Sequence, residues 1–154
     1  MGKAADTVRA GLKVYADRGV FRNFTEAKGR NGTIAFGFRL FGDHPVRIEF
    51  AERRQTLTVR NMLTQVSADM YADLQAFLAQ LSDSTRPMHR RIDRRAADVR
   101  FERKRGNVSL VFRVRGNRYA YGVETVVSLA SWIRTHLQQW HAEYMWRVMG
   151  EPEG

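Results

Sequence analysis

Strand-like alternation of apolar and polar residues occurs in two separate groups of segments, and this pattern limits the fold more than any other feature of the chain. Between residues 33 and 41, for example, Ile34, Phe36 and Phe38 fall on one face of an extended chain, and small or polar residues fall between them. Neighbouring segments are separated by short turns, several of which contain glycine and asparagine, as in hairpins. The segments are 20–26, 33–41, 46–50 and 56–60 in the first group, and 99–104, 108–115 and 118–122 in the second. Consecutive strands joined in this way predict an antiparallel sheet.

Three segments with helical spacing of apolar residues flank and separate the two groups. The first covers residues 3–18, and the second runs from an N-cap at Ser67 to about Ser82. The third is expected from about Thr125 to Met149. Its main apolar stripe consists of Val126, Leu129, Ile133, Leu137, Trp140, Tyr144 and Val148. We therefore expect an α+β fold with one antiparallel sheet of six to seven strands, in the order helix, four strands, helix, three strands, helix.

The chain of 154 residues has the length of one domain, and its composition excludes several kinds of site. It contains no cysteine, which excludes disulfide bonds, thiol catalysis, iron–sulfur clusters and zinc sites with cysteine ligands. No apolar run approaches the roughly 20 residues of a membrane span. The N-terminal segment has no apolar signal-peptide core. We expect a cytoplasmic protein with one domain at residues 1–150 and a short tail at 151–154.

Positive charge is concentrated in about one fifth of the sequence. The formal net charge is +10, and residues 86–118 alone carry twelve basic and three acidic side chains. Such a cluster attracts polyanions or acidic protein surfaces, and the planar guanidinium of arginine binds phosphate and carboxylate with two hydrogen bonds. The alternative is an ordinary solvated surface with scattered ion pairs. The candidate binding residues are Arg90, Arg91, Arg94, Arg95, Arg100, Arg103, Lys104, Arg105, Arg113 and Arg115.

No set of residues forms a recognisable catalytic or metal-binding motif. His136 and His141 are five positions apart, so they do not share one face of a continuous helix as a zinc-binding His-x3-His pair does. His141 and Glu143 have the spacing of the His-x-Glu pair of zinc deaminases, but the cysteine ligands are absent. The chain has neither a Walker sequence nor a Gly-x-Gly-x-x-Gly sequence. We expect no enzymatic activity, no metal ion, no cofactor and no small-molecule substrate.

Some aromatic residues fall outside the expected core. Phenylalanines of the strands and helices occupy positions on the apolar faces, where packing explains them. Trp132 and Trp146 lie off the main stripe of the last helix, and a helix with a second apolar face often contacts a second partner. Tyr119 and Tyr121 are further candidates for exposed contacts. We expect these four residues to form a dimer or partner face.

The order of elements resembles the type III secretion chaperone-like fold, which is shared by the YbjN-like family of bacterial proteins. The local sequence also resembles an uncharacterised group of small bacterial proteins, in the segments 86–93 (Arg-Pro-Met-His-Arg-Arg-Ile-Asp), 106–110 (Gly-Asn-Val-Ser-Leu), 119–129 (Tyr-Ala-Tyr-Gly-Val-Glu-Thr-Val-Val-Ser-Leu) and 143–145 (Glu-Tyr-Met). The resemblance covers the whole chain in the order of elements and is carried by short motifs. It implies a non-enzymatic, usually dimeric protein that binds other proteins.

Two functions are therefore expected, in this order. The first is a chaperone-like or regulator-like module, homodimeric, that binds another protein and has an arginine-rich surface. The alternative is a nucleic-acid-binding module that uses residues 86–118 to contact phosphates. Because no recognition helix is found in that segment, such binding would be indifferent to base sequence.

Overall fold

Six antiparallel strands form one sheet in the order β1-β2-β3-β4-β6-β5, in a computed structural model that describes residues 3–40, 44–81, 92–93 and 95–150. The strands are β1 Arg22–Lys28, β2 Ile34–Leu40, β3 His44–Ala51, β4 Thr56–Leu63, β5 Ala97–Lys104 and β6 Asn107–Val114. The helices are α1 Lys3–Asp17, α2 Ala68–Leu81, α3 Tyr119–Trp140 and α4 Ala142–Arg147, with a 3-10 turn η1 at Arg30–Gly32. The expected α+β fold with one antiparallel sheet is confirmed.

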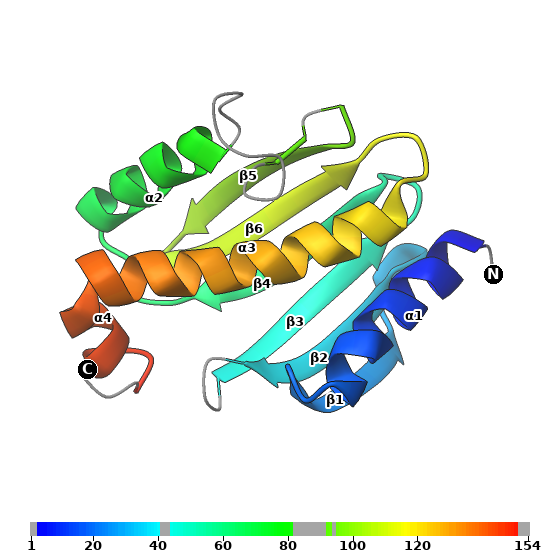
Figure 1. Cartoon of the computed structure of the whole chain (residues 1–154), viewed down its shortest axis with the longest axis horizontal. Helices are drawn as coiled ribbons and strands as arrows, with labels where there is room; N and C mark the ends of the chain where they lie inside the picture. The colour runs from blue at the N-terminus through cyan, green and yellow to red at the C-terminus, as the bar shows by residue number, and fades with distance from the viewer. Residues whose placement is uncertain (1–2, 41–43, 82–91, 94, 151–154) are drawn as a thin grey trace.

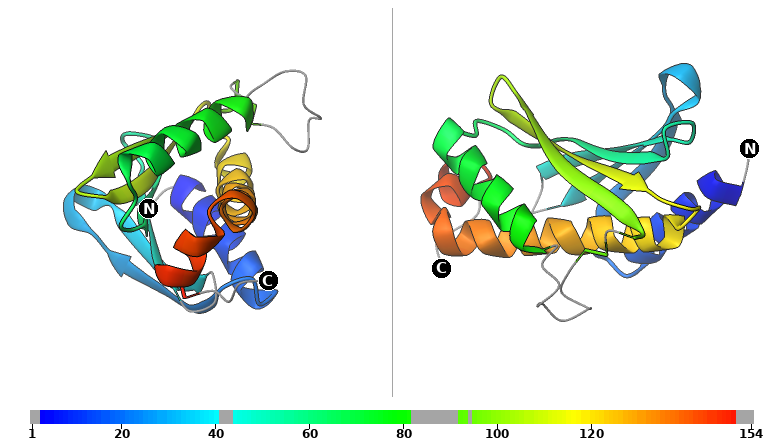
Figure 2. Two further views of the ribbon diagram at one scale, coloured as in Figure 1. Left: turned by 90° about the vertical axis from the view of Figure 1, so that its left-hand side faces the viewer. Right: turned by 90° about the horizontal axis from the view of Figure 1, so that it is seen from above.

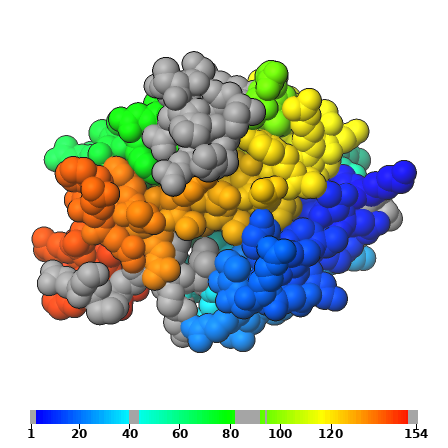
Figure 3. All heavy atoms as spheres, in the orientation of Figure 1, coloured from blue at the N-terminus to red at the C-terminus, as the bar shows by residue number. Residues whose placement is uncertain are grey.

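The helices lie on one face of the sheet, and the core lies between the two layers (Figures 1 and 2). α3 runs along the sheet with α1 beside it, as the space-filling view in Figure 3 also shows. The inward positions of the strands are apolar and buried, among them Phe36, Phe50 and Phe112. Alternation along each strand leaves polar residues on the opposite face, which no described α-helix covers (Figure 2).

The pairing of β4 with β6 joins the two groups of strands. Thr56 lies opposite Arg113, and Leu57 lies opposite Phe112. The segment between these strands contains α2 and β5, so β6 enters the sheet between two strands that precede it in the chain. This arrangement places the outward side chains of both strand groups on one surface.

The start of α2 agrees with the prediction. The backbone N–H of Met70 donates a hydrogen bond to Oγ of Ser67 at 3.1 Å, which is the N-cap contact that the sequence indicates. Asp69 lies in the first turn, where the helix dipole favours a negative charge.

Two expected elements are wrong at the C-terminal side. No strand covers residues 118–122, because α3 begins at Tyr119, and Tyr119 and Val123 extend the buried helical stripe by nearly two turns before Val126. The single helix expected to Met149 is two helices, since His141 has φ −138° and ψ 48° and ends α3 before α4 begins. Trp140, expected in the core stripe, is the last residue of α3 and is 66% exposed.

None of the helices in the described ranges has an apolar stretch that could cross a membrane.

Burial of Tyr144 in α4 predicts a loss of stability in alkali. Its hydroxyl donates a hydrogen bond to the carbonyl of Thr64 at 2.6 Å, and burial raises the pKa of Tyr144 from 10.0 to about 12. Because the pKa of Tyr144 is higher in the folded than in the unfolded protein, its neutral hydroxyl stabilises the fold below pH 10. This contribution to the free energy of unfolding is lost as the pH rises towards 12. We expect the free energy of unfolding to fall by about 2–3 kcal/mol more in the wild type than in Tyr144→Phe over this range.

Urea unfolding at a series of pH values measures this difference. Tyr15 and Tyr119, whose pKa values are also raised by burial, contribute equally to both proteins. An identical decline in the two proteins would contradict the assignment to Tyr144.

Candidate functional site

The uncovered face of the sheet carries an excess of arginine, and we call it the basic face. Its exposed basic residues include Arg47 and Arg60 on β3 and β4, Arg100, Lys104 and Arg113 on β5 and β6, and Arg30, Arg53, Arg54 and Arg115 at strand ends and turns. All nine side chains are exposed. The acidic residues on the same face are Glu49, Glu52, Asp98 and Glu102. The basic face therefore has a net positive charge.

One part of the basic face is hollowed into a groove of about 980 Å³. It lies between η1, which stands above the sheet in Figure 2, and the turn that joins β3 to β4. Five arginines and two glutamates line it: Arg30, Arg47, Arg53, Arg54, Arg60, Glu49 and Glu52. Its floor is formed by small residues such as Ala51 and Thr58, so an extended chain can approach the sheet closely.

Ion pairs neutralise some of these charges and leave others available. Nε of Arg60 lies 3.0 Å from Oε2 of Glu49, and Nε of Arg47 lies 3.7 Å from Oε1 of the same carboxylate. Arg53 and Arg54 have no ion pair within the described residues. Exposed pairs of this kind contribute about 0–1 kcal/mol each, so a ligand carboxylate can compete for the paired arginines as well.

The residues predicted from the charge cluster are divided between several places. Arg100, Lys104, Arg113 and Arg115 lie on the basic face, where Arg100 pairs with Glu102 at 2.9 Å and Arg115 pairs with Asp98. Register places Arg113 opposite Thr56, which lines the groove, so these arginines continue its positive surface.

The other predicted basic residues lie elsewhere. Arg95 pairs with Asp93 at 3.2 Å, and Nε of Arg103 donates to the carbonyl of Val66 at 3.0 Å. Arg105 lies in the turn between β5 and β6. Arg90, Arg91 and Arg94 lie outside the described residues.

The five arginines of the groove come from the first half of the chain, and none of them is among the binding residues predicted from the charge cluster. Their spacing did contain a signal, since Arg47 and Arg60 occupy polar positions between the apolar residues of strands. The basic face as a whole can be recognised only when β4 is known to pair with β6. A count of charges along the chain does not show this pairing.

The four residues of the expected partner face do not form one surface. Tyr119 was expected to be exposed, and this is wrong: it is 3% exposed and its ring meets Phe50 edge-on, because α3 begins earlier than predicted. Tyr121 is half-buried, and its hydroxyl accepts a hydrogen bond from the backbone N–H of Asp93 at 2.8 Å. Trp132 is partly buried against the core, whereas Trp146 is 57% exposed.

A histidine–aspartate cluster lies where α2 meets the junction of α3 and α4. Nε2 of His136 and Nε2 of His141 lie 2.8 Å and 2.7 Å from the same oxygen, Oδ2 of Asp73. Hydrogen bonds from His136 and His141 hold the pKa of Asp73 below its usual range. The ring of His136 also stacks on Phe77 at 4.2 Å between centroids, which fixes its orientation.

One continuous helix, as expected from the sequence, would not form this cluster, because residues five positions apart on such a helix lie on different faces. Because α3 ends before His141, the two histidines do not belong to one helix, and both side chains contact Asp73. An open hollow of about 920 Å³ adjoins the cluster and is also lined by Trp132 and Trp140.

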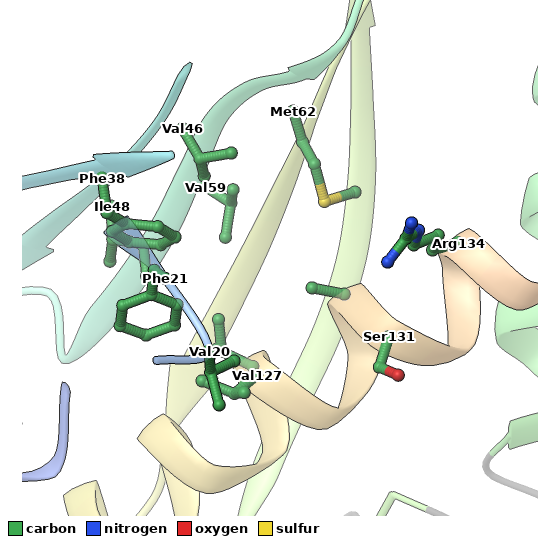
Figure 4. Close-up of a pocket in the computed structure, with 12 residues that line it drawn as sticks. Val20, Phe21, Phe38, Val46, Ile48, Val59, Met62, Val127, Ser131 and Arg134 are labelled. Carbon is green, nitrogen blue, oxygen red and sulfur yellow. The ribbon is translucent and has the colours of Figure 1, made fainter. Parts of the chain in front are cut away.

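A smaller apolar cavity of about 180 Å³ lies between the sheet and α3 (Figure 4). Phe21, Val46 and Met62 are among its lining residues, and Ser131 and Arg134 of α3 lie at one side. Its volume is below the roughly 300–1,000 Å³ that holds small organic ligands, so we assign it no ligand.

Comparisons with models of protein families, with curated proteins and with solved structures find no match to this chain. Membership of the YbjN-like family therefore stays a prediction. What can be inferred about function comes from the basic face and the histidine–aspartate cluster.

Proposed function

We propose that this protein is a non-enzymatic binding module that holds an acidic segment of a partner protein on the basic face. The observation that carries the proposal is the groove, in which Arg30, Arg53 and Arg54 have no ion pair within the described residues and stand around a floor of small side chains. Guanidinium groups bind carboxylates with paired hydrogen bonds, and a positive surface speeds the encounter with a negative partner. The proposal agrees with the protein-binding role that the resemblance implies.

An acidic protein segment fits the basic face better than a nucleic acid does. Carboxylates alternate with the basic residues, at Glu49 in the groove and at Asp98 and Glu102 beyond it. They repel an unbroken row of negative charges such as a phosphate backbone, whereas an acidic peptide can place neutral or basic side chains at these positions. The outward positions of the described strands include no aromatic ring, so the surface offers no base-stacking platform. A peptide with both carboxylates and a few basic groups could pair with both kinds of charge.

Binding of a short fluorescein-labelled peptide, in which most residues are Asp or Glu and a few are Lys, tests the proposal by fluorescence anisotropy. Arg53→Glu/Arg54→Glu should weaken binding by at least about tenfold, because two attractive contacts become repulsive. Lys13→Glu/Arg18→Glu is the matched control, since it changes the net charge equally at exposed positions on the helix side of the molecule. The control should bind the peptide as the wild type does, apart from a small long-range effect that salt removes.

Labelled single-stranded RNA and duplex DNA complete the experiment. If a nucleic acid binds with the same dependence on Arg53 and Arg54 and the peptide does not bind, the nucleic-acid function replaces the proposed one. If both double variants bind the peptide equally, or if the wild type binds neither kind of ligand, the proposal is wrong.

A homodimer is part of the proposed function. Trp140 and Trp146 are large apolar side chains that remain more than half exposed at the α3–α4 end, where a second copy could cover them. Sedimentation velocity at micromolar concentration distinguishes a dimer from a monomer, and a monomer would exclude this part of the proposal.

A further inference from the structure

We propose that Asp73, His136 and His141 form a binding site for one zinc ion. The inference is independent of the basic face, since the cluster lies on the helix side of the sheet. Two imidazole nitrogens and one carboxylate oxygen are the donor set of many zinc sites that keep a fourth position for water. The ligating atoms of all three residues lie within 4.8 Å of one another.

The positions of these atoms are close to those that a zinc ion needs. In a tetrahedral site with metal–ligand bonds of about 2.0–2.1 Å, neighbouring ligand atoms are about 3.3 Å apart. The distances of 2.8 Å and 2.7 Å from Oδ2 of Asp73 to the two histidines would have to lengthen by only about half an ångström. The two histidine nitrogens, which lie within 4.8 Å of each other, would have to approach to about the same 3.3 Å.

The three ligands come from separate elements whose packing holds them in place. Asp73 belongs to α2 and His136 to α3, and His141 is the single residue between α3 and α4. Stacking on Phe77 restricts rotation of the His136 ring, and loss of such support is typically costly for a metal site. The histidine side chains are 14% and 24% exposed, so they are shielded from solvent and still reachable by an ion.

The surroundings also suit a divalent cation with an open coordination position. The hollow beside the cluster is lined within the described chain by Gln80, Thr135, Gln139 and aromatic residues, with no Lys or Arg among them. Glu143 and Arg147 line the adjoining hollow that His141 also borders, and their formal charges cancel. These linings therefore carry no net positive charge that would oppose a cation, and water can complete its coordination.

Cobalt and zinc titrations of protein prepared without a polyhistidine tag test the site. We expect one equivalent of Co²⁺ to give the visible absorption of a four-coordinate or five-coordinate ion, and one equivalent of Zn²⁺ to displace it. Asp73→Asn and His141→Gln should each weaken zinc binding by more than about 100-fold, since even loss of a supporting residue costs about 10–100-fold. His44→Gln is the matched control, because that histidine lies on β3 and contacts the carbonyl of Met62.

Thermal unfolding with and without zinc shows whether the cluster binds a metal or only joins the helices by hydrogen bonds. If the cluster binds zinc, the ion should raise the Tm of the wild type and of His44→Gln but leave Asp73→Asn unchanged. The inference is wrong if the wild type takes up no stoichiometric metal, or if the Asp73 and His141 variants bind as tightly as the control. Circular dichroism confirms that each variant is folded before its result is interpreted.

Discussion

Leu129→Ala should lower the free energy of unfolding by about 3–5 kcal/mol, which is a large part of the 5–15 kcal/mol that stabilises a typical domain. Leu129 lies in the middle of α3 and is fully buried. It belongs to the same core cluster as Phe50 and Leu110 of the sheet, so its removal leaves a cavity between the two layers. Rigid strands on one side and a 22-residue helix on the other can close little of that space.

Urea unfolding monitored by circular dichroism measures this loss. Val14→Ala is a suitable control, because Val14 is 45% exposed on α1 and its truncation should change stability by less than about 0.5 kcal/mol. A loss below about 1 kcal/mol for Leu129→Ala would show that α3 does not pack on the sheet in the described way.

Gly122→Val should also be strongly destabilising, by about 2–3 kcal/mol, because side chains of the sheet pack directly against α3 at this residue. A Cβ atom at Gly122 would lie 2.8 Å from Cγ2 of Val114 and 3.4 Å from Cδ1 of Leu57. Valine adds two further methyl groups to that crowded position. The helix would have to move away from the strands, and its neighbours in the core would lose contact.

A double-mutant cycle with Val114→Ala identifies the cause of this loss. Removal of the Val114 methyl groups relieves the closest contact, so Val114→Ala should cost less stability in the Gly122→Val background than in the wild type. Strictly additive effects would indicate that the lower helix propensity of valine, and not the contact with Val114, explains the result. Equilibrium unfolding of the four proteins provides the required values.

Much of the fold follows from local patterns, and the errors occur where tertiary contacts decide. The alternation of Ile34, Phe36 and Phe38 was sufficient to predict a strand, since one face of it is buried against helices. The segment after Asn117 has an apolar pattern that suits either a short strand or a helix turn, and packing of Tyr119 against Phe50 selects the helix. The interruption of the helix at His141 could not be predicted in this way, because the sequence has no proline or glycine there.

The candidate sites could be predicted less well than the fold. The sequence identifies Arg100, Lys104 and Arg113 as basic residues of a strand surface, and they lie on the basic face. It does not identify Arg53 or Arg54 as part of this surface, because the position of β4 next to β6 depends on the pairing of strands far apart in the chain. The histidine–aspartate cluster likewise joins residues 63 and 68 positions apart, and no local spacing encodes such a contact.

The position of β6 between β4 and β5 has a consequence for synthesis of the protein on the ribosome. The first four strands can pair as soon as they emerge, but the outer edge of β4 receives its partner only when residues 107–114 have been made. At a translation rate of about 5–20 residues per second, that edge stays unpaired for several seconds. Leu57, Val59 and Met62 are accessible during this interval, so the nascent chain passes through a stage at which it is prone to aggregate and at which a cellular chaperone would be most useful to it.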